Sequence, residues 1–226
     1  EGPALTDIAV GVWLRDAPEA ERLGESDLRA RLENAALAVL DPGAFERVRL
    51  DLEAVVASRS TWVAETTKAI ASALAEENIP HVTIQHRTKH VAGVWRKMQE
   101  KHLSIEEVHD LLAFRIIVPE IDHCYLALET VHHLFDPQPF RFKDYIAEPK
   151  ANGYQSLHTS VRHRDGLVFE IQIRSVAMHR AAELGPASHW RYRAGKKPVS
   201  NFVGRIGHRS LRRWLRIGTR PSSAFR

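Results

Sequence analysis

Two acidic residues and two groups of basic residues are the side chains of this sequence best suited to chemistry on phosphates. Asp110 lies just before an apolar run, and Glu170 lies within a later segment of alternating polar and apolar residues. If these segments are neighbouring strands, their carboxylates form a pair that suits Mg²⁺, which prefers oxygen ligands. Basic side chains nearby would neutralise phosphate charge. The candidates are Arg87, Lys89, Arg96, Lys97 and Lys101, followed later by Arg141, Lys143 and Lys150.

Other motifs either support this chemistry weakly or are missing. Asn152-Gly153-Tyr154 predicts a turn with an exposed ring on which a base could stack, although a tyrosine after glycine more often packs. There is no G-x-x-x-x-G-K-[ST] loop and no G-x-G-x-x-G segment. His123, His132 and His133 share a predicted helix, but no acid or cysteine at ligand spacing completes a zinc site. No serine or cysteine stands in a nucleophile-elbow motif.

The composition is that of a globular protein. Of 226 residues, 44% are hydrophobic and 27% are charged, which suits one α/β domain with an appendage. No apolar run approaches the length of a bilayer span, and no secretory signal opens the chain. Cys124 is the one cysteine, which indicates the reducing cytoplasm and is best interpreted as a buried helix residue. Because the first residue is Glu1, we expect a processed chain or a fragment.

Charge is distributed unevenly along the chain, although its net value is only +4. No acidic residue follows Glu183, whereas Arg and Lys recur as far as Arg226. This pattern predicts a basic tail over residues 195–226. One interpretation is contact with a polyanion such as RNA, the ribosome, a nucleotide or acidic lipids, and the other is a solvated tail. We expect no membrane partner.

The periodicity of apolar residues, together with capping and helix-ending residues, predicts the helices and strands that must position these side chains. Residues 1–20 carry little pattern. A helix is predicted over 26–40, with Ser26 as its N-cap and Asp41-Pro42-Gly43 as its end. The later predictions are a helix over 45–77 broken near 58–61, a strand over 81–86, a helix over 89–101, a short helix from a Ser104/Glu107 capping box to Asp110, a strand over 112–118, a helix over 121–135, a loop over 136–152 and a helix over 176–191. This alternation indicates an α/β fold, a mixed sheet with flanking helices.

A hairpin over 156–163 and 167–174 allows a prediction of register. A two-residue turn would place Val161 opposite Glu170, whereas a three-residue loop with Gly166 left-handed places it opposite Phe169. The second register separates two faces. Leu157, Thr159 and Val161 then meet Ile173, Ile171 and Phe169 in the core, while Ser156, His158 and Ser160 meet Arg174, Gln172 and Glu170. The polar face could be simply solvated, but its mixture of groups favours a nucleotide and a metal.

Eight short strings occur in a particular order between about Arg22 and Arg193. They are His86-Arg87-Thr88-Lys89-His90, Trp95-Arg96-Lys97-Met98, Asp110-Leu111-Leu112-Ala113-Phe114-Arg115, Arg141-Phe142-Lys143-Asp144-Tyr145-Ile146, Asn152-Gly153-Tyr154-Gln155-Ser156-Leu157-His158-Thr159, Glu170-Ile171-Gln172-Ile173-Arg174, Glu183-Leu184-Gly185 and His189-Trp190-Arg191-Tyr192. In this order the chain resembles the synthetase domain of the RelA/SpoT homologue family of stringent-response alarmone synthetases. Two departures are His86, where the family has glycine, and Gly93, where it usually has serine.

The resemblance implies a nucleotidyltransferase-like fold and transfer of pyrophosphate from ATP to the 3′-hydroxyl of GDP or GTP, with Mg²⁺ or alternatively Mn²⁺. It implies that Asp110 and Glu170 are the catalytic and metal-binding residues, with Glu170 as the base. Tyr154 would stack on guanine. The implied ATP-binding residues are Arg87, Lys89, Lys97 and Arg115, and the implied acceptor-binding residues are Lys143, Lys150, Asn152, Tyr154, His158 and Gln172.

The resemblance also suggests a division of the chain. Residues 1–44 would be the helical connector that follows a hydrolase domain in long members, 45–194 the synthetase domain and 195–226 the basic tail. One alternative is a catalytically weak nucleotide-sensing or RNA-binding remnant of a longer protein. Another is a different nucleotidyltransferase such as a tRNA nucleotide adder, although that class needs closely paired acids that do not precede Glu170. The choice between GDP and GTP and the oligomeric state stay open.

Overall fold

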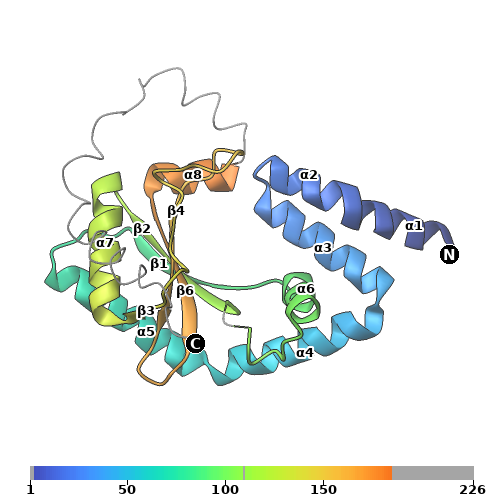
Figure 1. Cartoon of the computed structure of the whole chain (residues 1–226), viewed down its shortest axis with the longest axis horizontal. Coiled ribbons are helices and arrows are strands. Elements are labelled where there is room, and N and C mark those ends of the chain that lie inside the picture. The colour runs from blue at the N-terminus through green and yellow to red at the C-terminus, as the bar shows by residue number, and fades with distance from the viewer. Residues whose placement is uncertain (1–2, 109, 185–226) are drawn as a thin grey trace, which may run out of the picture.

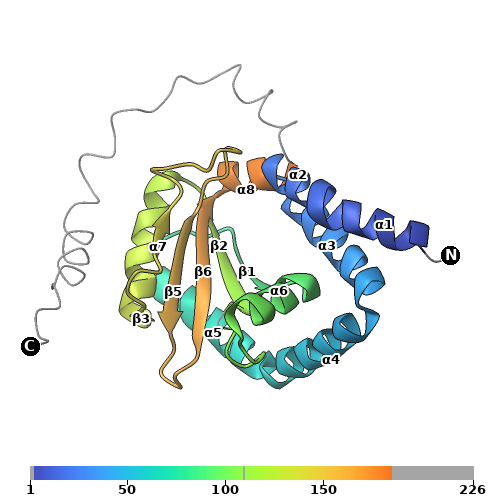
Figure 2. The same ribbon diagram turned by 45° about the vertical axis from the view of Figure 1, so that its right-hand side comes forward.

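The computed structural model describes residues 3–108 and 110–184, in which an all-helical part precedes an α/β part (Figures 1 and 2). The first part contains α1 (Pro3–Gly11), the π-helix η1 (Val12–Asp16), α2 (Ala17–Arg22), α3 (Ser26–Leu40), α4 (Pro42–Ser58) and α5 (Ser60–Glu76). The second contains β1 (Thr83–Thr88), α6 (Val91–Lys101), β2 (Leu112–Val118), α7 (Ile121–Leu134), β3 (Asp136–Pro137), β4 (Lys143–Asp144), β5 (Leu157–Arg162), β6 (Val168–Ser175) and α8 (Val176–Leu184).

The sheet has the strand order β1-β2-β6-β5-β3, and β4 also pairs with β5. Strands β2 and β6 are parallel, and the other pairs are antiparallel. The mixed sheet with flanking helices confirms the predicted fold class. The parallel pair matters most for the site, because it sets Ala113 opposite Glu170. The chain just after Asp110 therefore runs beside the acidic residue of β6.

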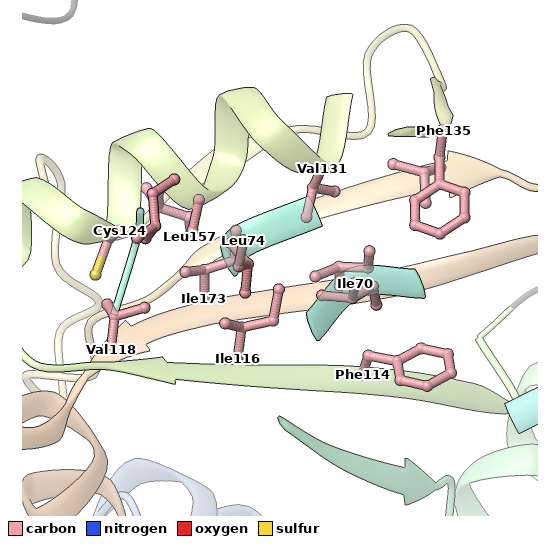
Figure 3. Close-up of a cluster of buried hydrophobic side chains, with 14 of the residues drawn as sticks. Ile70, Leu74, Phe114, Ile116, Val118, Cys124, Val131, Phe135, Leu157 and Ile173 are labelled. Atoms are coloured by element: carbon pink, nitrogen blue, oxygen red, sulfur yellow. The ribbon is translucent and has the colours of Figure 1, made fainter. Parts of the chain in front are cut away.

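One face of the sheet forms the main hydrophobic core with α5 and α7 (Figure 3). Phe114, Ile116 and Val118 alternate along β2 and are buried in this layer. Successive side chains of a strand point to opposite faces. Arg115 on β2 and Glu170 on β6 therefore belong to the other face, which carries the polar residues. Helix α6 lies on the far side of the sheet from α7, enclosed by the arc of α3 and α4 (Figures 1 and 2).

The predicted register of the β5–β6 hairpin is confirmed, and Gly166 has the left-handed φ of 90° that its loop requires. The observed pairs are Leu157–Ile173, His158–Gln172, Thr159–Ile171, Ser160–Glu170, Val161–Phe169 and Arg162–Val168. The predicted Ser156–Arg174 pair lies outside the ladder, because β5 begins one residue after Ser156. The Ser156 hydroxyl instead donates to the carbonyl of Ile173 at 3.0 Å.

Several helix boundaries are also as predicted. Asp41 ends α3 and caps α4, since its carboxylate accepts from the Ala44 amide at 2.8 Å. The break between α4 and α5 falls at Arg59, inside the predicted interval. Cys124 is a fully buried residue of α7, which ends at Leu134, one residue earlier than predicted.

Other predicted limits of helices and strands were wrong. Ser26 is the first residue of α3 and Glu25 holds the cap position without a side-chain bond. Residues 104–108 form turns rather than a helix, although Glu107 accepts from the Ser104 amide at 2.8 Å, as in half of a capping box. The loop over 136–152 contains the two-residue strands β3 and β4, and the strand predicted over 81–86 spans 83–88.

The predicted helix over 89–101 begins two residues later than expected, at Val91. Residues 3–22 are helical, although the residue pattern of 1–20 alone predicted no element there. The end of the helix predicted to Arg191 and the basic tail lie outside the described residues. No helix within the described part of the chain is long and apolar enough to span a bilayer.

Candidate active site

The carboxylate of Asp110 is the centre of the first half of the site. Its Oδ2 atom lies 3.0 Å from Nζ of Lys89 and 2.7 Å from Nζ of Lys97. Its Oδ1 atom is buried and has no hydrogen-bond partner among the described residues. Burial by itself would raise the pKa of Asp110, but the charges of the two lysines outweigh it and lower that pKa. Asp110 is therefore an ionised carboxylate with one oxygen that no described residue bonds.

Three elements bring these charges together. Lys89 follows β1 and its backbone amide donates to the carbonyl of Leu111 at 2.9 Å, which ties the end of β1 to the start of β2. Lys97 lies on α6, on the face turned to Asp110. Asp110, Lys89 and Lys97 therefore come from three parts of the chain and form one charged cluster.

Glu170 on β6 is the centre of the second half. Its Oε1 atom lies 2.6 Å from Nδ1 of His158 on β5, and the Gln172 amide donates to its Oε2 atom at 3.4 Å. Burial would raise the pKa of Glu170, but the hydrogen bond and charge of His158 outweigh it and lower that pKa. The negative charge of Asp110 raises the pKa of Glu170, so the two carboxylates are close enough to interact electrostatically.

Tyr154 extends this second half into an aromatic group. Its hydroxyl lies 2.9 Å from Nε2 of His158, and the ring of Tyr145 packs edge-on against the same imidazole. Nζ of Lys150 lies 5.1 Å from the ring centre of Tyr145 and 5.2 Å from that of Tyr154, within reach of a cation–π interaction. Burial raises the pKa of Tyr154, so its hydroxyl keeps its proton.

Asn152 makes two hydrogen bonds that the sequence analysis did not predict. Its Oδ1 atom accepts from the Tyr154 amide at 3.1 Å, and its Nδ2 donates to the carbonyl of Glu21 at 3.0 Å. Gly153 between them has a φ of 81°, a conformation that favours glycine. The turn that carries Tyr154 is therefore tied to the end of α2. Lys143 is exposed on β4, where it pairs with His158 in the backbone ladder.

Three arginines lie near one another at the α8 end of the site. Arg115 is mostly buried, and its Nη1 lies 3.3 Å from a Glu183 oxygen that also accepts from Arg174 at 2.9 Å. Burial first, and then the charges of Arg174 and Arg87, lower the pKa of Arg115. The Nε atoms of Arg115 and Arg174 have no hydrogen-bond partner among the described residues. Excess positive charge of this kind suits an anionic ligand.

Comparison of the sequence around this site with known proteins identifies the family of the chain. The model of the region found in RelA and SpoT proteins matches residues 86–197. This chain belongs to the RelA/SpoT family. The match covers all the residues predicted for the site, from Arg87 to Gln172.

Relatives of this RelA/SpoT chain agree with the match. It is 41% identical over 179 residues to a GTP pyrophosphokinase of Haemophilus influenzae, covering 79% of this chain and 24% of that protein. It is 40% identical over 180 residues to the bifunctional (p)ppGpp synthase/hydrolase RelA of Mycobacterium tuberculosis, covering 80% of this chain and 24% of that protein. The chain thus spans about a quarter of the length of these relatives.

A solved structure is similar as well. Small alarmone synthetase 1 of Bacillus subtilis, bound to its product pppGpp, is 28% identical with a TM-score of 0.47, over 62% of this chain and 81% of that one.

Sequence reasoning missed part of the site of this RelA/SpoT chain. Arg174 is only 1% exposed and bonds Glu183 and His179, yet it had been placed only on the polar face of the hairpin. Its spacing of four from Glu170 on one strand was the available signal, because such residues share a face. His86, the departure from the family glycine, is exposed on β1, and β1 lies at the edge of the sheet.

Proposed function

We propose that this chain transfers pyrophosphate from ATP to the 3′-hydroxyl of GDP or GTP. The observation that carries the proposal is a pair of carboxylates, Asp110 just before β2 and Glu170 on the neighbouring parallel strand β6. Lysines bond Asp110, and a histidine–tyrosine chain bonds Glu170. Relatives about 40% identical are named GTP pyrophosphokinase or (p)ppGpp synthase/hydrolase, which supports this reaction.

Asp110 and Glu170 fit a divalent cation. Asp110 offers a buried oxygen without a hydrogen-bond partner in the described part of the chain, and carboxylates are ligands that Mg²⁺ and Mn²⁺ accept. The described residues hold no group of three or more acidic, histidine or cysteine ligands, so phosphate oxygens and water would complete the coordination. A bound cation would supply positive charge to the triphosphate.

Glu170 would take the proton of the 3′-hydroxyl. Its lowered pKa keeps the carboxylate ionised at neutral pH. The bond from His158 fixes one oxygen, while the other accepts only a long bond of 3.4 Å from Gln172 among the described residues. A bond then forms between O3′ and the β-phosphorus of ATP, and the bond from that phosphorus to the oxygen bridging it to the α-phosphate breaks. AMP leaves with that oxygen. The charges of Lys89 and Lys97 would offset those of the phosphates.

The two nucleotides would lie on opposite halves of the site. We assign ATP to the half with Asp110, where Arg87 and Arg115 could stack on adenine. Guanine would stack on Tyr154, with Lys143, Lys150 and Gln172 near the acceptor and His158 holding the ring and Glu170 in place. Asn152 would act by fixing the Tyr154 turn, since both ends of its amide are already bonded.

The test is product analysis with the purified chain, ATP, Mg²⁺ and either GDP or GTP. The expected result is guanosine tetraphosphate or pentaphosphate together with an equal amount of AMP, detected by ion-exchange chromatography. Asp110→Asn and Glu170→Gln should form neither. If the unaltered chain forms no product while still binding both nucleotides, the catalytically weak sensor replaces this proposal.

Location and partners are further proposals. We place the chain in the cytoplasm on the strength of its substrates and its single buried cysteine. Contact with RNA or the ribosome through residues 195–226 rests on their basic composition alone. A salt-dependent shift of the chain with ribosomes in a sedimentation assay would support this contact, and an oligomer would appear in the same run without ribosomes.

A further inference from the structure

Glu33 on α3 is a buried carboxylate far outside the residues matched by the family model. Its side chain is 4% exposed and accepts hydrogen bonds from three basic side chains, at 2.7 Å from His90 and at 2.8 Å from both Arg96 and Arg29. A charge that is so buried persists only where its partners are well placed. Two of these partners, His90 and Arg96, belong to the start and the middle of α6.

The neighbouring residue makes a second link to the same helix. Oδ1 of Asn34 accepts from the Ala92 amide at 2.9 Å, one of the backbone donors that a helix start leaves free. His90 occupies the cap position of α6 but gives no side-chain cap. The cap of α6 therefore comes from α3, which lies alongside it (Figures 1 and 2).

The first two turns of α6 carry the site. Lys97 on this helix contacts Asp110 at 2.7 Å, and Lys89, two residues before the helix, contacts the same oxygen at 3.0 Å. A change in the position of α6 would move Lys97 away from the point where a phosphate and Asp110 meet. A misplacement of about 1 Å in a positioned group can cost on the order of a hundredfold in rate.

From these contacts we infer that Glu33 and Asn34 are positioning residues of the ATP half of the site, acting through α6. The inference rests on the proposed function for its kinetic part only. It moves the N-terminal limit of the catalytic unit from residue 45 back to α3. Neither residue touches the predicted acceptor group, so the effect belongs to ATP rather than to GDP or GTP.

The first test needs no nucleotide. Lys97 of the full chain is acetylated with an amine-reactive ester and quantified by mass spectrometry relative to Lys101, an exposed lysine one helical turn further along α6. We expect Glu33→Gln and Asn34→Ala to raise Lys97 labelling severalfold. The control Glu46→Gln removes an exposed carboxylate that bonds Arg49 on its own helix, and should leave the ratio unchanged. Unchanged Lys97 labelling in both variants would overturn the inference.

The second test separates positioning from mere stability. In Glu33→Gln and Asn34→Ala the KM for ATP should rise about tenfold or more while the KM for the acceptor stays constant. Asn34→Ala keeps every ion pair of Glu33 and so remains testable if Glu33→Gln folds poorly. A lowered unfolding temperature with both KM values unchanged would mean that the residues are structural only. Altered labelling in a chain that makes no alarmone would instead refute the proposed function and leave the helix positioning intact.

Discussion

Nδ1 of His158 lies 2.6 Å from Oε1 of Glu170. An ionised carboxylate can only accept, so this nitrogen carries the proton. The other ring nitrogen lies 2.9 Å from the Tyr154 hydroxyl. The imidazole therefore links the proposed base to the proposed guanine platform.

Removal of His158 should change how Glu170 titrates. The hydrogen bond from His158 favours the ionised form of Glu170 and lowers its pKa. In His158→Ala the pKa of Glu170 should rise, because burial then acts with less opposition. A base works when deprotonated, so the acidic limb of the pH profile of kcat/KM should move to higher pH. An acidic limb at the same pH in both proteins would exclude His158 as the residue that sets this pKa.

Tyr154 should matter through its ring more than through its hydroxyl. Stacking of a base on an aromatic residue contributes about 1–3 kcal/mol, which corresponds to roughly a tenfold or greater rise in the acceptor KM of Tyr154→Ala. Tyr154→Phe keeps the ring and loses only the bond to His158, so its acceptor KM should stay close to that of the parent. Both values come from initial rates at saturating ATP. If the ATP KM rises instead, the two nucleotides have been assigned to the wrong halves.

The lysines on Asp110 should oppose binding of a cation on its own. Both Nζ atoms contact Oδ2 of Asp110, beside the Oδ1 atom that a metal would approach, and like charges repel at short range. Without nucleotide, Lys97→Met should therefore bind Mn²⁺ more tightly than the parent, as measured by electron paramagnetic resonance. Lys101→Met removes an equal charge on the same helix but not at Asp110, and serves as the control. Equal gains in both variants would show a general charge effect rather than competition at the carboxylate.

Glu33 should make the free energy of unfolding depend on pH in the acidic range. Burial by itself would raise the pKa of Glu33, but bonds from His90, Arg29 and Arg96 outweigh it and lower the pKa from 4.5 to about 2. A carboxylate with a lowered folded pKa stabilises the fold above its unfolded pKa, and loses this contribution as pH falls. Unfolding by urea should show Glu33→Gln less stable by at most about 3 kcal/mol at pH 7. The difference should shrink between pH 4.5 and 2, and a constant difference would contradict the ionic role.

The sequence predicted the parts of the structure that depend on residues close together in the chain. Alternation predicted the β5–β6 register, because a shift of one residue would have placed Glu170 opposite the core residue Val161. Two partners of Glu33, His90 and Arg96, could not be predicted, since they are 57 and 63 residues away and no periodicity links them to α3. The role of Asn152 was missed for the same reason. Its partner, the carbonyl of Glu21, is a backbone atom that leaves no trace in residue types.

Gly93 offers a test of the same α3–α6 contact from the other side. A Cβ at this position would lie 2.8 Å from Cε1 and 3.0 Å from Nε2 of His90. Alanine inside a helix usually stabilises it by up to about 1 kcal/mol relative to glycine. Here the ring would have to move, and its bond to Glu33 at 2.7 Å resists that movement.

We therefore expect Gly93→Ala to destabilise the chain and to raise the KM for ATP, in spite of its better helix propensity. The alanine should become neutral or favourable once the ring is gone. A double-mutant cycle with His90→Ala, followed by urea unfolding, measures this directly, because residues in contact show coupling energies of about 0.5–3 kcal/mol whereas independent ones add. Additive effects, or a Gly93→Ala chain as stable as its parent, would mean that His90 can leave Glu33 at little cost and that Asn34 alone holds the start of α6.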